Sequence, residues 1–168
     1  MRKKLVLYAS AYGSTRRYAR FIAERLECPA VEVWRLKREL LDGVDTVIFG
    51  GWLCGGVVAG AAFLSAHMDW LCGKRLIVFI TGSGEYRGTS RLSDIADFNF
   101  SCLSPAGIFY FRGDLCYRKM HWYHKFLINF MMVEDNKEER KRLKSTQLNT
   151  QENQALELVH FTNSQWGL

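Results

Sequence analysis

The sequence contains little of what marks several protein classes. Two prolines and 14 glycines in 168 residues exclude collagen-like and low-complexity chains. No apolar stretch reaches the ~18 uninterrupted residues of a membrane-spanning helix. The five cysteines are odd in number and form no CxxC pair. We therefore expect neither a disulfide framework nor a bound metal, and reduced thiols typical of a cytoplasmic protein.

Apolar residues, in contrast, are plentiful enough for a full core. The chain is 48% hydrophobic and 14% aromatic, which predicts one folded domain spanning residues 1–168. The basic residues 2–4 precede a short apolar run, 5–8. That run is shorter than the roughly 7–15 residues of a secretory leader's apolar region. We interpret it as a buried first strand and expect a cytoplasmic location.

Strand-like and helix-like segments alternate along the chain, with short glycine-rich joints between them. This pattern predicts an α/β fold with a five-stranded parallel sheet covered on both faces. An insertion at about 113–148 separates the fifth strand from the last helix, where Thr150 is the expected N-cap and Leu156 and Val159 face inward, with Leu158 as a further candidate. The expected strands are 4–9, 31–34, 46–49, 76–80 and 107–111, and the expected helices are 15–26, 61–71, 89–98 and 151–161.

A hydroxyl-rich loop joins the first strand to the first helix. Backbone N–H groups at a helix N-terminus favour an anion, and a glycine lets that anion come close. The loop lacks the lysine of a Walker A motif and the GxGxxG of a dinucleotide site. It therefore suits a terminal phosphate monoester, although an ordinary helix cap with a flexible turn is the alternative. Its residues are Ser10, Ala11, Tyr12, Gly13, Ser14 and Thr15.

This loop resembles the Thr/Ser-x-Thr/Ser/Tyr-Gly-x-Thr motif of the flavodoxin superfamily. The resemblance implies a doubly wound sheet in the order 2-1-3-4-5, with FMN at the carboxyl ends of the strands. Two further loops then meet the flavin ring, with Trp52 and Tyr86 as its candidate neighbours; the alternative is that Trp52 only packs on the sheet. The loop after strand three holds Gly51, Trp52, Leu53, Cys54, Gly55 and Gly56; the loop after strand four holds Thr81, Gly82, Ser83, Gly84 and Tyr86.

The insertion combines aromatic and basic residues. On a helical wheel, residues 115–133 form an apolar arc of nearly half the circumference, which is typical of a helix at a membrane interface. Residues 112–145 carry nine Lys or Arg against five Asp or Glu, so +4 of the chain's net +6 lies here. We expect this helix to dock on an anionic membrane surface. The alternative is that it packs on the protein's own core or in a homodimer.

The insertion is also similar to the flavodoxin-type, quinone-dependent protoporphyrinogen IX dehydrogenases. The family's Trp-Tyr-x-Arg/Lys-Phe-x-Ile pattern matches Trp122, Tyr123, Lys125, Phe126 and Ile128. The resemblance implies oxidation of a protoporphyrinogen IX-like substrate, with electrons passing through FMN to a quinone at the inner face of the cell membrane.

That reaction is centred on the flavin, so no side chain is expected to act as a nucleophile. Arg87, Arg112 and Arg118 are candidates for holding the substrate's propionates. His121 and His124 are candidate proton acceptors, although both fall on the polar side of the expected helix.

Two other classes of function stay open. A non-enzymatic flavodoxin electron carrier fits the same fold, but such carriers usually meet partners through an acidic surface. A flavin-free receiver domain needs an acidic cluster after the first strand, where Ser10 stands instead. Nucleic acid is not an expected partner, because no RNP, helix-turn-helix or zinc pattern occurs.

Overall fold

A parallel sheet forms the centre of the molecule. The computed structural model describes residues 3–84, 89–114, 120–122, 124–126 and 148–164. The strand order is β2-β1-β3-β5-β6, so the predicted order of the five parallel strands and the α/β class are confirmed. These strands are β1 (Lys3–Ala9), β2 (Ala30–Glu32), β3 (Val44–Cys54), β5 (Arg75–Gly82) and β6 (Gly107–Arg112).

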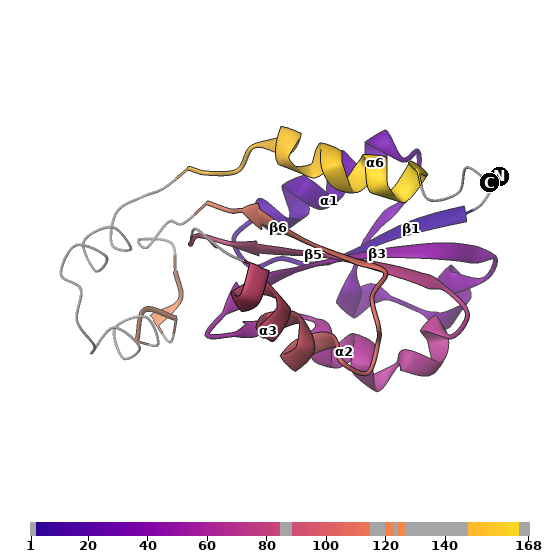
Figure 1. Cartoon of the computed structure of the whole chain (residues 1–168), viewed down its shortest axis with the longest axis horizontal. Coiled ribbons are helices and arrows are strands. Elements are labelled where there is room, and N and C mark those ends of the chain that lie inside the picture. The colour runs from indigo at the N-terminus through magenta and orange to yellow at the C-terminus, as the bar shows by residue number, and fades with distance from the viewer. Residues whose placement is uncertain (1–2, 85–88, 115–119, 123, 127–147, 165–168) are drawn as a thin grey trace.

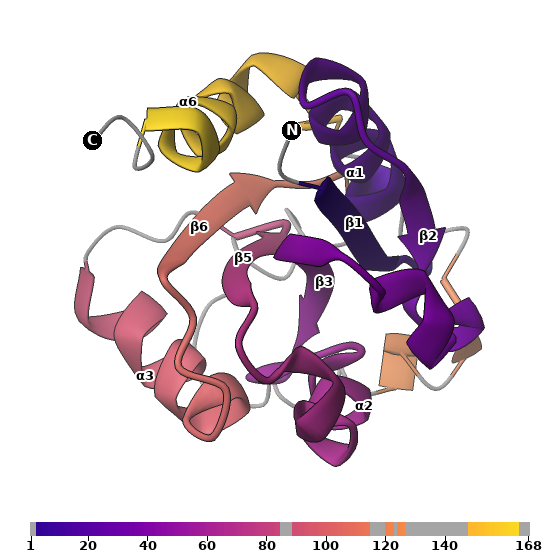
Figure 2. The same ribbon diagram turned by 90° about the vertical axis from the view of Figure 1, so that its right-hand side faces the viewer.

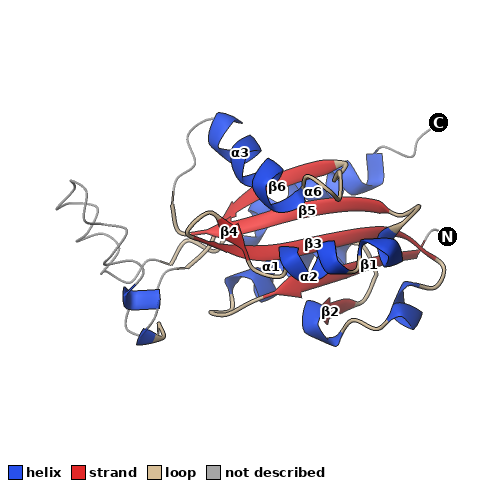
Figure 3. Cartoon of the chain, turned by 90° about the horizontal axis from the view of Figure 1, so that it is seen from below, coloured by secondary structure: helices blue, strands red, loops and turns tan. Residues whose placement is uncertain are grey.

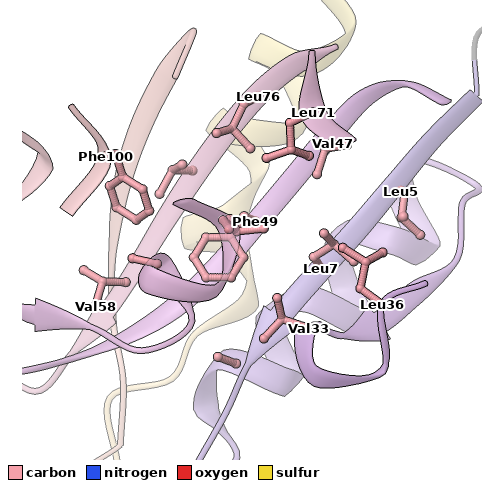
Figure 4. Close-up of a cluster of buried hydrophobic side chains, with 14 of the residues drawn as sticks. Leu5, Leu7, Val33, Leu36, Val47, Phe49, Val58, Leu71, Leu76 and Phe100 are labelled. Atoms are coloured by element: carbon pink, nitrogen blue, oxygen red, sulfur yellow. The ribbon is translucent and has the colours of Figure 1, made fainter. Parts of the chain in front are cut away.

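Helices cover both faces of the sheet. In Figure 2, helices α1 (Ser14–Arg25) and α6 (Leu156–Ser164) lie on one side, and α2 (Ala61–Ala66) and α3 (Thr89–Phe100) lie on the other. Alternate residues of β1 serve the two cores: Val6 packs toward α1, whereas Leu5 and Leu7 belong to the opposite cluster. Figure 4 shows part of this second cluster. Burial on both faces explains why the strands read as continuous apolar runs.

The third strand is longer than predicted and turns back on itself. It continues through Cys54 and pairs antiparallel with a sixth, two-residue strand, β4 (Val57–Val58), which lies beside its end in Figure 3. Gly55 and Gly56 make the turn with φ values of 59° and 83°, a region that favours glycine. The expected loop at 51–56 is therefore a strand end and a hairpin.

Three further boundaries differ from the prediction. The expected helix 61–71 is interrupted at His67, whose Nδ1 lies 2.8 Å from the Phe63 carbonyl oxygen, and η3 (Met68–Leu71) follows. The expected strand 31–34 ends at Glu32 and continues as the 3₁₀ turns η1 (Val33–Arg35) and η2 (Arg38–Leu41).

The closing helix begins as a 3₁₀ turn, η5 (Glu152–Ala155), whose N-cap is Gln151. Thr150 is therefore not the cap, and its buried Oγ1 has no hydrogen-bond partner. Leu158 and Val159 are buried in the core, while Leu156 is only half-buried. Within the part of the chain that the structure describes, no helix has the length and apolar character needed to cross a bilayer.

Candidate functional site

Three connections meet at the carboxyl edge of the sheet. The strand register places Ala9 beside Gly51 and Trp52 beside Thr81, so the loop after β1 lies level with the ends of β3 and β5. Figure 1 shows the described part of the insertion, in orange, beyond this same edge. Ligands of open parallel sheets bind at such an edge, where the strand order reverses; here it reverses between β1 and β3.

The first loop is built around Gly13 and Ser10. Gly13 is the N-cap of α1 with φ 103° and, as a glycine, offers no capping side chain of its own. The N–H groups of Gly13 and Arg16 donate to the Ser10 Oγ, at 3.2 and 3.4 Å. A hydroxyl that accepts in this way keeps its own proton to donate. Ser10 can therefore donate to an anion at the helix N-terminus.

The hydroxyls of Ser14 and Thr15 contact neighbouring segments. The buried Thr15 Oγ1 lies 2.7 Å from the buried Thr81 Oγ1, near the end of β5. The Ser14 Oγ accepts the N–H of Asp114 at 2.9 Å, so Ser14 also retains a proton to donate. A Cβ at Gly113 would come within 3.2 Å of the Ser14 Cβ, which explains why glycine stands where the insertion leaves the sheet.

Hydrogen bonds of Asp114 with Asn149 and Thr150 join the two ends of the insertion beside this loop, and we call this contact the clip. The Asp114 Oδ1 accepts the N–H groups of Asn149 and Thr150, at 2.7 and 2.8 Å, and Arg17 lies 3.8 Å from its Oδ2. These donors and Arg17 offset the carboxylate's charge next to the loop 10–15. Sequence analysis missed Gly113 and Asp114, although a Gly-Asp pair directly after a strand was the available signal.

Tyr18 of α1 makes two hydrogen bonds near the two ends of the insertion. Its hydroxyl donates to the Arg112 carbonyl oxygen at 2.6 Å and accepts the Gln151 N–H at 3.1 Å. Burial raises the pKa of Tyr18 above its ordinary value, so the phenol stays protonated and keeps both bonds. The end of β6 and the start of η5 are thereby held on α1.

Aromatic side chains form the second part of the site. The rings of Tyr12 and Trp52 meet edge to face with centroids 6.0 Å apart. His124 of the insertion packs edge-on against Trp52 at 4.9 Å and is hydrogen-bonded through Nδ1 to the Tyr12 hydroxyl. Trp52 is half-buried and belongs to this cluster, not only to the packing on the sheet. Through His124, the insertion thus contacts both of the segments 10–15 and 51–56, which were predicted to bind the cofactor.

His124 lies differently from the expectation for a solvated helix face. It is half-buried, and burial together with the nearby His121 lowers its pKa below the ordinary histidine value. The expected helix 115–133 is not continuous, because Met120 and His121 are not helical, whereas Trp122 and residues 124–126 are. Trp122 and Phe126 on the predicted apolar arc are 78% and 66% exposed.

The remaining predicted residues are distributed around this edge. Cys54 is half-buried and burial raises the pKa of its thiol, as expected for a small protonated cysteine. The Gly84 carbonyl accepts the Tyr110 hydroxyl at 2.9 Å. The Arg112 Nη2 lies 3.4 Å from the Asn149 Oδ1 and so faces the clip.

The other predicted residues differ in exposure or lie outside the described part of the chain. Ala11 is exposed, and Leu53, Gly82 and Ser83 are half-buried. Tyr86, Arg87 and Arg118 lie outside the described residues.

Comparisons with known proteins agree with this geometry. The family model described as a flavodoxin domain matches residues 5–142. A search of curated proteins gave no match. A solved structure from Bacteroides eggerthii, assigned as a flavoprotein, has 16% identity, a TM-score of 0.53, and covers 78% of this chain and 96% of its own. An archaeal flavodoxin has 12% identity, a TM-score of 0.50, and coverages of 76% and 94%. At these identities the structural likeness supports the fold alone.

Proposed function

Because the chain belongs to the flavodoxin domain family, we propose that it is an FMN-binding oxidoreductase. The observation that carries the proposal is the loop 10–15, where the N-terminus of α1 and the hydroxyls of Ser10 and Ser14 converge at the reversal of strand order. Hydroxyl and amide donors at a helix N-terminus are the groups that a phosphate monoester requires.

The residues present fit FMN in both of its parts. Gly13 has a positive φ, and the space beside it is open, since a Cβ there would meet no atom within 4 Å. The half-buried indole of Trp52 lies beside this loop and offers an aromatic surface to a planar ring. When bound, FMN would supply the electron and hydride chemistry that the side chains themselves do not provide.

The described residues then divide into binding and supporting roles. Ser10 and Ser14 would donate hydrogen bonds to the phosphate, and the first N–H groups of α1 would add a favourable dipole. Thr15 and Thr81 hold the first turn of α1 against the end of β5 through their mutual hydrogen bond. Asp114 keeps the start of the insertion next to residues 10–15, which we call the phosphate loop.

The reaction we propose is the oxidation of a reduced, protoporphyrinogen IX-like substrate, with a membrane quinone as the electron acceptor. Support comes from the insertion's resemblance to that dehydrogenase family and from the exposed Trp122 and Phe126, which suit contact with a lipid surface. In this proposal the basic insertion brings the protein to the inner face of the cell membrane, where the quinone is dissolved.

A flavodoxin electron carrier is the second candidate. Membership of the flavodoxin domain family favours it directly, and it needs the same FMN site. The formal net charge of +6 weighs against it, because carriers of this kind usually present an acidic surface to their partners.

The absorbance spectrum of the purified protein tests FMN binding. We expect a flavin spectrum after purification or after addition of FMN, and FMN as the flavin released on denaturation. FAD as the released flavin, or no binding of added FMN, would contradict the proposal. With FMN bound, anaerobic mixing with protoporphyrinogen IX and then with menadione separates the two candidates: an enzyme forms protoporphyrin and reduces the quinone with repeated turnover, whereas a carrier does not.

A further inference from the structure

A histidine from the insertion reaches the point where the two cofactor segments meet. His124 contacts Tyr12 of the phosphate loop by a hydrogen bond and Trp52 of the hairpin by its ring edge. More than a hundred residues separate Tyr12 from His124 along the chain. His124 itself belongs to neither of the two hydrophobic cores.

The hydrogen bonds around Tyr12 are compatible with a neutral His124. The His121 N–H donates to the Tyr12 hydroxyl oxygen at 3.4 Å, so the phenol proton can point toward the His124 Nδ1. That nitrogen then acts as an acceptor, which requires a neutral imidazole with its proton on Nε2. Burial and the neighbouring His121 disfavour the imidazolium, in agreement with this tautomer.

We propose that His124 contacts the flavin ring, so that the insertion completes the ring-binding site. The inference rests on the proposed FMN function. A ring whose phosphate lies at residues 10–15 and whose face or edge lies against Trp52 is within reach of His124, because His124 touches a residue of both segments. The imidazole contributes a second aromatic ring next to Trp52, at the place where the flavin ring is proposed to lie.

Comparison of FMN with riboflavin isolates this contact from the phosphate site. Riboflavin has the same ring and no phosphate, so the loss of a ring contact weakens both ligands by the same factor. We expect His124→Ala to raise the dissociation constants of FMN and riboflavin equally, by five-fold or more. Ser10→Ala, in contrast, is expected to weaken FMN and leave riboflavin unchanged.

Three further variants divide the contribution of His124. His124→Asn keeps an acceptor for Tyr12 and should recover part of the affinity, while His124→Phe keeps a ring on Trp52 without the acceptor. Tyr12→Phe removes the hydrogen bond and leaves His124 in place, and should also weaken both ligands equally. His160→Ala, an exposed residue of α6, is the matched control and should bind both flavins as the wild type does.

The visible absorption bands of bound FMN give a second readout. We expect His124→Ala to shift these bands relative to the wild type, while thermal unfolding of the flavin-free variant is unchanged. If His124→Ala unfolds instead, Tyr12→Phe provides the same comparison.

The outcomes distinguish the two proposals. Unchanged affinities in His124→Ala, or weakening of FMN alone, while Ser10→Ala behaves as expected, would overturn the ring contact and leave the phosphate site standing. A wild type that binds no FMN would overturn both.

Discussion

The hydroxyl groups of the phosphate loop differ in what surrounds them. Ser10 and Ser14 accept backbone N–H groups and retain protons for a ligand, whereas Thr15 is buried against Thr81. From the sequence motif alone, these three hydroxyls are equally good candidates for contact with the phosphate. In the proposed FMN site the two serines are therefore the candidate donors to the ligand, and the threonine has a supporting position.

Replacing Thr15 should therefore affect stability. In Thr15→Ala the Thr81 Oγ1 is left buried without its partner, and an unsatisfied buried hydroxyl costs about 1–3 kcal/mol. Thr15→Ala and Thr81→Ala should each lower the free energy of unfolding, and the double variant should lose less than the sum of the two. Urea unfolding of the four proteins measures this; strictly additive losses would show that the two hydroxyls do not interact.

The pKa of His124 provides a second test at the residue scale. Burial lowers this pKa, which means that protonation is disfavoured when the histidine is packed on Trp52. The packed arrangement is therefore fully favourable above the ordinary histidine pKa of about 6.5 and weakens as the pH falls below that value. An NMR titration of the four histidines should place His124 below 6.5, and Trp52→Ala should raise its pKa. A His124 that titrates at 6.5 in both proteins would contradict the packing.

Among the elements, those with strong local patterns could be predicted and those set by tertiary contacts could not. Continuous apolar runs identified the central strands because both of their faces are buried. The hairpin after β3 was missed, because its pairing depends on Asn99 of α3, which accepts the Val58 N–H and donates to the Gly56 carbonyl. Gly55 and Gly56 fit a hairpin turn, but the same glycines also fit the cofactor loop that the family resemblance implies.

The candidate site shows the same division. Residues 10–15 are contiguous, so a hydroxyl-rich turn at the start of α1 could be recognised from the sequence. Asp114 and His124 reach the site through the path of the insertion, which no local pattern describes. The helical wheel placed His124 on the solvated side because it assumed one continuous helix, whereas Met120 and His121 are not helical.

The clip at the base of the insertion gives a prediction for this element. Asp114→Ala removes the acceptor of two backbone N–H groups and a contact with Arg17. We expect it to lower the free energy of unfolding by about 1–3 kcal/mol and to speed proteolysis near Asn149. Asp97→Ala, at an exposed position of α3, is the control. Equal protease sensitivity of the two variants would rule out a role for the clip.

For the whole molecule, the uneven charge leads to a prediction about membranes. The excess of +4 in 112–145 and the exposed Trp122 and Phe126 predict sedimentation with anionic vesicles at low salt. Each Lys or Arg near such a surface contributes about 1 kcal/mol, and salt screens this attraction over about 10 Å at 0.1 M. Binding should fall with added salt and in Trp122→Ala/Phe126→Ala, while FMN affinity is retained. No binding at low salt would favour self-packing or a homodimer.

The central claim is that the loop 10–15 holds the phosphate of a flavin mononucleotide. Its most direct test is the affinity of the wild-type protein for FMN relative to riboflavin, measured by calorimetry at one pH and salt concentration. Each hydrogen bond to a charged phosphate is worth about 1.5–3 kcal/mol, so FMN should bind at least ten-fold more tightly than riboflavin. Equal affinity for the two ligands would contradict the claim.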